Sequence, residues 1–228
     1  MMKKRFLLIY SCIGIALLVI PPIMANINSG EAVFTLAVVK FQGGGDWYSC
    51  INAVRNLLRF TGRETPLTVS LKEKIVRLTD DDLFLYPFIF INGHGDLFFD
   101  AAETKRLRLY LSQGGFLFCN DDYGLDTFFR KEMKKVFPEL DFIELPASHD
   151  IYHCRYSFPE GLMKVHEHYK GPPHGYGLFY EGRMVCYYTF NSDIADGWEK
   201  ESVHNDPESV RTKALQMGVN VIYYALTH

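Results

Sequence analysis

The chain has 228 residues, of which 48% are hydrophobic and 22% are charged, and its formal net charge is -3 at pH 7. This hydrophobic content excludes general disorder, and the length suits one well-buried domain better than two. The mildly acidic balance is a poor electrostatic match for nucleic acid, so we expect no nucleic-acid partner.

The first 25 residues have the order of a secretory signal peptide. A cationic start at residues 1–5 precedes an apolar stretch at 6–20, the pair Pro21-Pro22 and the small residue Ala25. The apolar stretch is shorter than the roughly 20 residues of a spanning helix. We therefore expect an exported protein, periplasmic or secreted. The alternative is an uncleaved inner-membrane anchor formed by residues 6–24, which would be the only membrane contact.

Two short, unbroken apolar runs at residues 87–91 and 116–119 indicate buried parallel strands. A helical pattern from Asp100 to Gln113 lies between them, and Asp100 with Glu103 forms a capping-box pattern. This order predicts a strand, a crossover helix and a second strand, which is one βαβ unit.

Further patterns extend this unit into a single α/β domain over residues 32–226. The other expected elements are strands at 34–41 and 142–145, a further strand at 67–69 or 75–78, a helix with Asp46 as N-cap, a helix ending before Pro138, a β-hairpin at 176–190, and a last helix with Asp206 as N-cap. We therefore predict a three-layer αβα sandwich around a mostly parallel sheet, with the β-hairpin near the C-terminus.

Polar residues follow the predicted strands at their carboxyl ends, where open α/β sheets bind ligands. A loop over residues 146–173 is rich in histidine, and loops of this length are commonly functional. The candidate ligand-binding residues are Gly44, Asp46, Trp47, His94, Asp121, Asp122, His149 and Asp193.

The turn at Gly43-Gly44-Gly45 allows two interpretations. A glycine turn before a helix suits an anion, because bare backbone N–H groups meet a helix N-terminus. The carboxylate of Asp46 would repel such an anion, however. The alternative is a tight turn that only lets the helix pack closely.

Three uses of this polar edge remain open. The first is a divalent metal that activates water, with His94, Asp121 and Asp122 as ligands and His149 as ligand or base. A divalent metal is the only cofactor that the sequence suggests.

The second use is binding of a glycan or another small molecule without chemistry, because aromatic residues accompany the carboxylates. These aromatic residues are Trp47, Tyr48, Tyr123 and Trp198. The third use is structural. Asp121 would cap the following helix, and the domain would assemble with an envelope protein.

Four cysteines follow the predicted leader: Cys50, Cys119, Cys154 and Cys186. No Cys-x-x-Cys pair occurs, and the spacings match no zinc module. We expect buried thiols, although an exported protein can oxidise a pair.

Several separated motifs resemble the bacterial domain of unknown function 4159 over about residues 32–226. They are FQGGGDWY, LFLYPFIFINGHG, LRLYLSQGGFLFCNDDYG, Phe137-Pro138, and His149 with Ile151-Tyr152. The resemblance implies a flavodoxin-like sheet of the class I glutamine amidotransferase type and no established activity.

Proteins of the wider amidotransferase-like group carry a nucleophile on the turn after a central strand. The corresponding turn here holds Asn120-Asp121-Asp122 and no cysteine, and no GxSxG motif occurs. Amidotransferase activity is therefore not expected. The favoured function is ligand binding or assembly in the bacterial envelope, and the alternative is a metal-assisted hydrolase that uses His94, Asp121 and Asp122.

Overall fold

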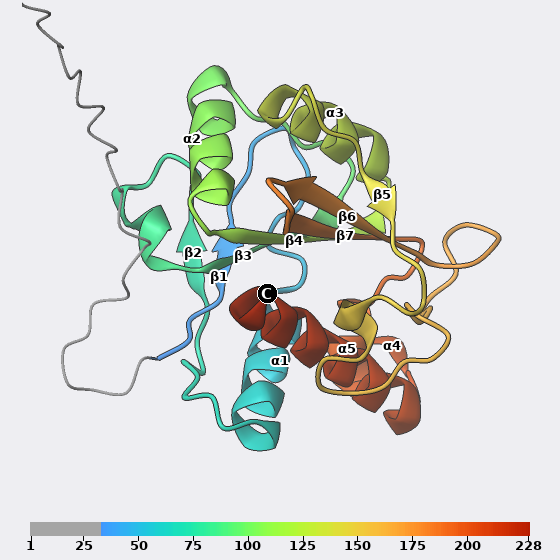
Figure 1. Ribbon diagram of the computed structural model, residues 1–228. Helices are drawn as coiled ribbons and strands as arrows, with labels where there is room; N and C mark the ends of the chain where they lie inside the picture. The colour runs from blue at the N-terminus through green and yellow to red at the C-terminus, as the bar shows by residue number, and fades with distance from the viewer. Residues whose placement is uncertain (1–32) are drawn as a thin grey trace, which may run out of the picture.

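A seven-stranded, mostly parallel sheet lies between two layers of helices (Figure 1). The computed structural model describes residues 33–228. The strand order is β2-β1-β3-β4-β7-β6-β5. The first five strands of this order are parallel, β6 runs antiparallel to β7, and β5 runs antiparallel to β6. The predicted α/β class is confirmed.

The strands are β1 Ala37–Val39, β2 Lys74–Val76, β3 Phe88–His94, β4 Phe116–Tyr123, β5 Ile143–Glu144, β6 His174–Tyr180 and β7 Arg183–Phe190. The α-helices are α1 Ile51–Glu64, α2 Ala101–Ser112, α3 Asp126–Val136, α4 Glu201–His204 and α5 Glu208–Thr227. Three short 3₁₀ helices are η1 Asp81–Leu85, η2 Asp150–Tyr152 and η3 Asp196–Trp198.

Each face of the sheet has its own apolar core. Helices α1 and α5 cover one face, and α2 and α3 cover the other (Figure 1). Alternate residues of β4 enter opposite cores, with Phe118 on the α1/α5 side and Cys119 on the α2/α3 side. The same alternation determines on which face of the sheet each polar side chain at the end of β4 lies.

The predicted N-cap residue was confirmed at α2, whereas the N-caps predicted for α1 and α5 were wrong. Asp100 and Glu103 form the predicted capping box at the start of α2. Helix α1 begins at Ile51 without a side-chain cap, because the Asp46 carboxylate bonds to His94 instead. Helix α5 begins after Pro207, and Asp206 bonds to His166.

Two strand predictions also need correction. Strand β4 continues through Tyr123, so Asn120-Asp121-Asp122 belong to the strand and not to a loop. Of the two alternatives for the further strand, residues 74–76 form β2, whereas Val69 makes only an isolated bridge with Phe34.

The predicted leader, residues 1–25, lies outside the described residues. Over residues 33–228, no helix has both the length and the apolar character needed to cross a bilayer. Cys50, Cys119, Cys154 and Cys186 are free thiols.

Candidate metal centre

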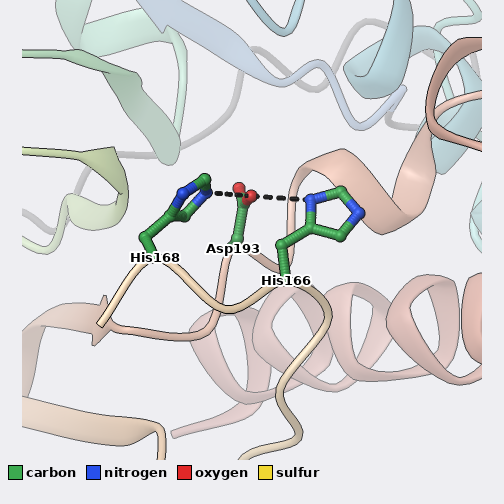
Figure 2. A group of neighbouring side chains, drawn as sticks. All are labelled: His166, His168 and Asp193. Carbon is green, nitrogen blue, oxygen red and sulfur yellow. Dashed lines mark hydrogen bonds and ion pairs between the residues drawn. The ribbon is translucent and has the colours of Figure 1, made fainter. Parts of the chain in front are cut away.

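Two histidines and one aspartate meet at the carboxyl end of β7 (Figure 2). The Nδ1 atom of His166 lies 2.9 Å from Oδ2 of Asp193, and the Nε2 atom of His168 lies 2.8 Å from the same oxygen. The Asp193 side chain is 0% exposed, and its Oδ1 atom has no hydrogen-bond partner. Two imidazole groups, which bind transition metals, therefore converge on one buried carboxylate, which can bind them too.

The end of β7 holds the histidine-rich loop in place. The Asn191 side-chain oxygen accepts a hydrogen bond from the backbone N–H of Tyr169, and the Ser192 carbonyl accepts one from Val165. Asn191 and Asp193 have left-handed backbone angles, with φ of 56° and 54°, which Asn and Asp adopt more readily than most residues. These bonds place His166 and His168 beside Asp193.

Further carboxylates surround His166. The Nε2 atom of His166 lies 3.1 Å from both oxygens of Asp206, so one ring nitrogen faces Asp193 and the other faces Asp206. The Oδ2 atom of Asp196 lies 3.3 Å from Nδ1 of His166 and 3.3 Å from Nε2 of His204. A carboxylate behind a ligand imidazole is typical of metal sites, where it fixes the ring orientation.

A second polar group lies at the carboxyl ends of β3 and β4. The Asp122 Oδ2 atom accepts a hydrogen bond from the Asn92 amide at 3.1 Å and lies 3.4 Å from Nδ1 of His94. Asp46 lies 3.0 Å from the same ring nitrogen and also accepts the His94 backbone N–H at 2.6 Å. Three of the predicted candidate residues, Asp46, His94 and Asp122, therefore lie together.

The two groups belong to one electrostatic cluster. Burial raises the pKa of Asp193, and the nearby carboxylates of Asp196 and Asp122 raise it further. Burial likewise raises the pKa of Asp196, with Asp122 as the next cause. Over residues 33–228, the ion pairs of these three aspartates involve histidine only. The cluster therefore favours either protons or a bound cation.

The imidazoles differ in their protonation preference. Burial lowers the pKa of His168, which favours its neutral, metal-binding form. Burial also lowers the pKa of His94, but Asp122 and Asp46 outweigh burial, so the pKa of His94 is raised overall. His94 is therefore suited to carrying a proton beside the cluster.

Asp121 does not belong to this site, although it was one of the predicted ligands. Its side chain lies on the α2/α3 face of the sheet, where Oδ1 accepts the backbone N–H of Leu125 at 2.8 Å. Burial raises its pKa to about 6. The strand alternation places Asp121 and Asp122 on opposite faces, so a ligand set containing both is excluded.

His149 is also absent from the cluster. Its ring packs against Tyr224 of α5 and Phe179 of β6, and its Nδ1 atom accepts the N–H of Ile151 at the start of η2. His149 therefore does not lie where it could act as a metal ligand or base of the cluster.

The glycine turn fits the tight-turn interpretation. Gly45 donates its N–H to the Asp96 carbonyl at 2.8 Å, and a side chain at Gly45 would collide with the backbone of Asp96 and His94. Gly44 is exposed, and Trp47 is half-buried between the two cores. The turn therefore packs Asp46 against the end of β3.

Trp198 was expected beside a ligand, but it is 0% exposed and donates its ring N–H to the Ala214 carbonyl. Tyr48 and Tyr123 are exposed. Of the four aromatic residues expected beside a ligand, Tyr48 and Tyr123 are therefore the exposed ones.

Most of the residues around Asp193 and Asp122 were not among the predicted site residues. They are Ser49, Cys50, His166, His168, Asp196, His204 and Asp206. One signal was present: the His-x-His spacing of His166 and His168, within a histidine-rich loop. The other residues come from the turn before α1, η3, α4 and the segment before α5, and only the fold brings them together.

The fold and this site define an α/β domain with a histidine–aspartate cluster at the carboxyl edge of its parallel strands. The family model described as Domain of unknown function (DUF4159) matches residues 35–226, and the chain belongs to this family. No curated protein matches the chain.

Proposed function

We propose that the chain binds a divalent transition-metal ion through His166, His168 and Asp193, and that the ion activates water for a hydrolytic reaction. The supporting observation is the contact of two imidazole nitrogens with one oxygen of the buried Asp193 carboxylate. Ligand atoms bonded to zinc at about 2.0–2.2 Å in a tetrahedron lie about 3.3–3.6 Å apart. The contacts of 2.8 and 2.9 Å are shorter than that spacing by about 0.4–0.8 Å.

The surroundings of His166 support the same assignment. Asp206 lies against Nε2, which leaves Nδ1 directed toward Asp193. A carboxylate in this position raises the basicity of a ligand imidazole and holds its tautomer. Asp206 is therefore the orienting partner of the proposed ligand.

Hydrolysis also needs a group that moves a proton. A metal ion lowers the pKa of its bound water to about 7 and supplies the nucleophile. His94 is held by Asp46 through Nδ1, while its Nε2 atom makes no hydrogen bond within residues 33–228. An imidazole oriented by a carboxylate with its second nitrogen free has the arrangement of a general acid or base.

Metal binding is tested on the full chain after treatment with a chelator. Titration with Zn²⁺, followed by calorimetry and elemental analysis, is expected to show tight binding that His168→Ala weakens at least tenfold. His174→Ala is the matched control, because His174 pairs with Glu144 outside the cluster. Absence of bound zinc in the unaltered protein would refute the proposal.

Hydrolysis is tested separately with the zinc-loaded protein on ester, amide and phosphoester substrates. His94→Gln is expected to lower turnover about 10²-fold or more while zinc stays bound, since acid–base catalysis contributes 10²–10⁴-fold. Turnover that persists unchanged in His94→Gln would remove His94 from the mechanism.

A second candidate function is carbohydrate binding at the same edge. Tyr123 is 48% exposed and stacks against Tyr169 at 5.4 Å, with His168 at 5.2 Å between ring centroids. An exposed aromatic face beside carboxylates suits a sugar ring. Thermal-shift screening with sugars and peptidoglycan fragments tests this function. Tyr123→Ala should abolish the shift, and Phe98→Ala, which removes an exposed ring elsewhere, should not.

We also propose that the fold is of the flavodoxin-like, class I glutamine amidotransferase type. The order β2-β1-β3-β4 at one side of the sheet supports this, because flavodoxin-like sheets share it. Cys119 is buried within β4 on the α2/α3 side, so it does not supply the nucleophile of that group.

We further propose that the domain acts outside the cytoplasm, because residues 1–25 have the order of an export leader. Cell fractionation of a C-terminally tagged chain, with N-terminal sequencing of the product, tests this. A full-length cytosolic product would contradict it.

A further inference from the structure

We propose that the cluster holds a second cation next to the first, bound by Cys50, Asp122 and Asp196, with Asp196 bridging the two ions. This inference rests on the proposed function, because it adds a subsite to the same centre. It makes the centre dinuclear and gives it one thiolate ligand.

The three ligand atoms lie close together, and the Asn92 amide nitrogen lies 2.8 Å from the Cys50 Sγ atom and 3.1 Å from Oδ2 of Asp122. The Cys50 Sγ atom lies 4.0 Å from Oδ2 of Asp122 and 3.9 Å from Oδ1 of Asp196. All three atoms lie within 4.8 Å of one another. With Zn–S of about 2.3 Å and Zn–O of about 2.0 Å, sulfur and oxygen ligands of one ion are about 3.5 Å apart. The subsite therefore needs a contraction of about half an ångström.

The two oxygens of Asp196 face different groups of ligands. Its Oδ1 atom lies next to Cys50, whereas Oδ2 lies 3.3 Å from Nδ1 of His166, a ligand of the first ion. A carboxylate in this position bridges two ions in the manner of dinuclear hydrolases, whose metals lie about 3.5–4 Å apart.

A buried carboxylate oxygen without a hydrogen-bond donor supports the presence of a second cation. The carboxylates of Asp122 and Asp196 lie close enough to Asp193 to raise its pKa, yet the Asp193 Oδ1 atom has no hydrogen-bond donor. Three carboxylates thus meet where the described residues supply only histidines as counter-charges. One divalent ion neutralises two carboxylates, and a second ion neutralises the third carboxylate together with the thiolate.

The thiol between two carboxylates defines the kind of ion. Cys50 is buried, and hard cations such as Mg²⁺ and Ca²⁺ prefer oxygen ligands only. A site with one thiolate and two carboxylates favours Zn²⁺ or Co²⁺ over these ions. Binding would release the Cys50 proton to solvent.

Cobalt titration of the full chain under reducing conditions tests this subsite. We expect two Co²⁺ per chain and a thiolate-to-cobalt charge-transfer band in the near ultraviolet. Cys50→Ser should bind one Co²⁺ and lack the band. Cys154→Ser is the matched control, since the Cys154 thiol bonds to the Asn220 carbonyl away from the cluster. It should keep both ions and the band.

Each result separates the second subsite from the first. One bound ion without the band in the unaltered protein overturns the second subsite and leaves the proposed first ion standing. A band that survives in Cys50→Ser removes Cys50 as a ligand and overturns the subsite as described. No bound ion at all refutes both proposals. If Cys50→Ser does not fold, Asp122→Asn gives the same test, with loss of one ion expected.

Discussion

Asp121 and Asp122 are consecutive residues of β4 whose side chains lie on opposite faces of the sheet. Asp122 accepts a hydrogen bond from Asn92 within the cluster, and Asp121 accepts the backbone N–H of Leu125 before α3. Successive residues of a strand point to opposite faces, so two adjacent carboxylates serve two separate environments.

This relationship gives a matched pair of variants. Asp122→Asn should bind one fewer Co²⁺ than the unaltered protein, because it removes a carboxylate ligand of the second subsite. Asp121→Asn should leave the stoichiometry unchanged, since its side chain lies on the other face. Elemental analysis of both proteins after cobalt loading makes the comparison. Equal losses in the two variants would contradict the face assignment.

Bound zinc should stabilise the folded chain. A ligand present at 100 times its dissociation constant adds about 2.7 kcal/mol to the free energy of unfolding. For a chain of this size, each kcal/mol raises the midpoint of thermal unfolding by about 2–4 °C, so a shift of about 5–10 °C is expected. Calorimetric scans with and without Zn²⁺ measure it.

His168→Ala should reduce that shift, since it removes one of three ligands of the first ion. Any shift that remains would come from the proposed second subsite, which does not contain His168. His174→Ala should retain the full shift. A shift of the same size in His168→Ala would show that zinc stabilises the chain elsewhere.

His149 should make the stability of the chain depend on pH. Burial lowers its pKa from 6.5, opposed by Asp150 and assisted by His228. A base whose folded-state pKa is lowered stabilises the fold fully above its unfolded pKa. That contribution falls as the pH drops below about 6.5, until the folded state is protonated as well.

The variant His149→Asn isolates this effect. Asparagine keeps an acceptor for the N–H of Ile151 and does not titrate. Urea unfolding of chelator-treated protein at pH 7.5 and at pH 5 should show a smaller loss of stability on acidification for the variant. An equal or larger loss in the variant would contradict the assignment.

Gly175 of β6 is predicted to tolerate no side chain. A Cβ atom there would overlap the hydroxyl oxygen of Tyr152 and crowd that of Tyr187, and both rings are buried. Gly175→Ala should therefore lower the free energy of unfolding by about 1–3 kcal/mol. Gly182→Ala is not a neutral comparison, because Gly182 has a φ of 81°. Gly62→Ala, where the nearest atom lies 3.6 Å away, is the better control.

The sequence predicted those features that depend on neighbouring residues. The apolar runs of β3 and β4 identified parallel strands, and Asp100 with Glu103 gave the start of α2. Predictions from neighbouring residues were wrong where a side chain bonds to a residue that is distant in the sequence. Aspartate is a residue type favoured at helix N-caps, but the side chain of Asp46 bonds to His94, which lies 48 residues away in the sequence.

The histidine–aspartate cluster shows the same limit. Asp193 and His94 were predicted at strand ends, because carboxyl ends of parallel strands share one edge. The contacts of Asp193 with His166 and His168 span 27 and 25 residues, and no periodic pattern predicts which loop crosses that edge. Asp121 was misplaced because β4 runs further than its apolar residues indicate.

The attachment of the histidine-rich loop to Asn191 and Ser192 makes the histidine–aspartate cluster depend on the native position of β7. An unfolded chain does not hold His166, His168 and Asp193 together, whereas in the native chain β7 pairs with β4 and its end positions all three residues. Metal uptake at this centre would thus report that the last third of the polypeptide has reached its native arrangement.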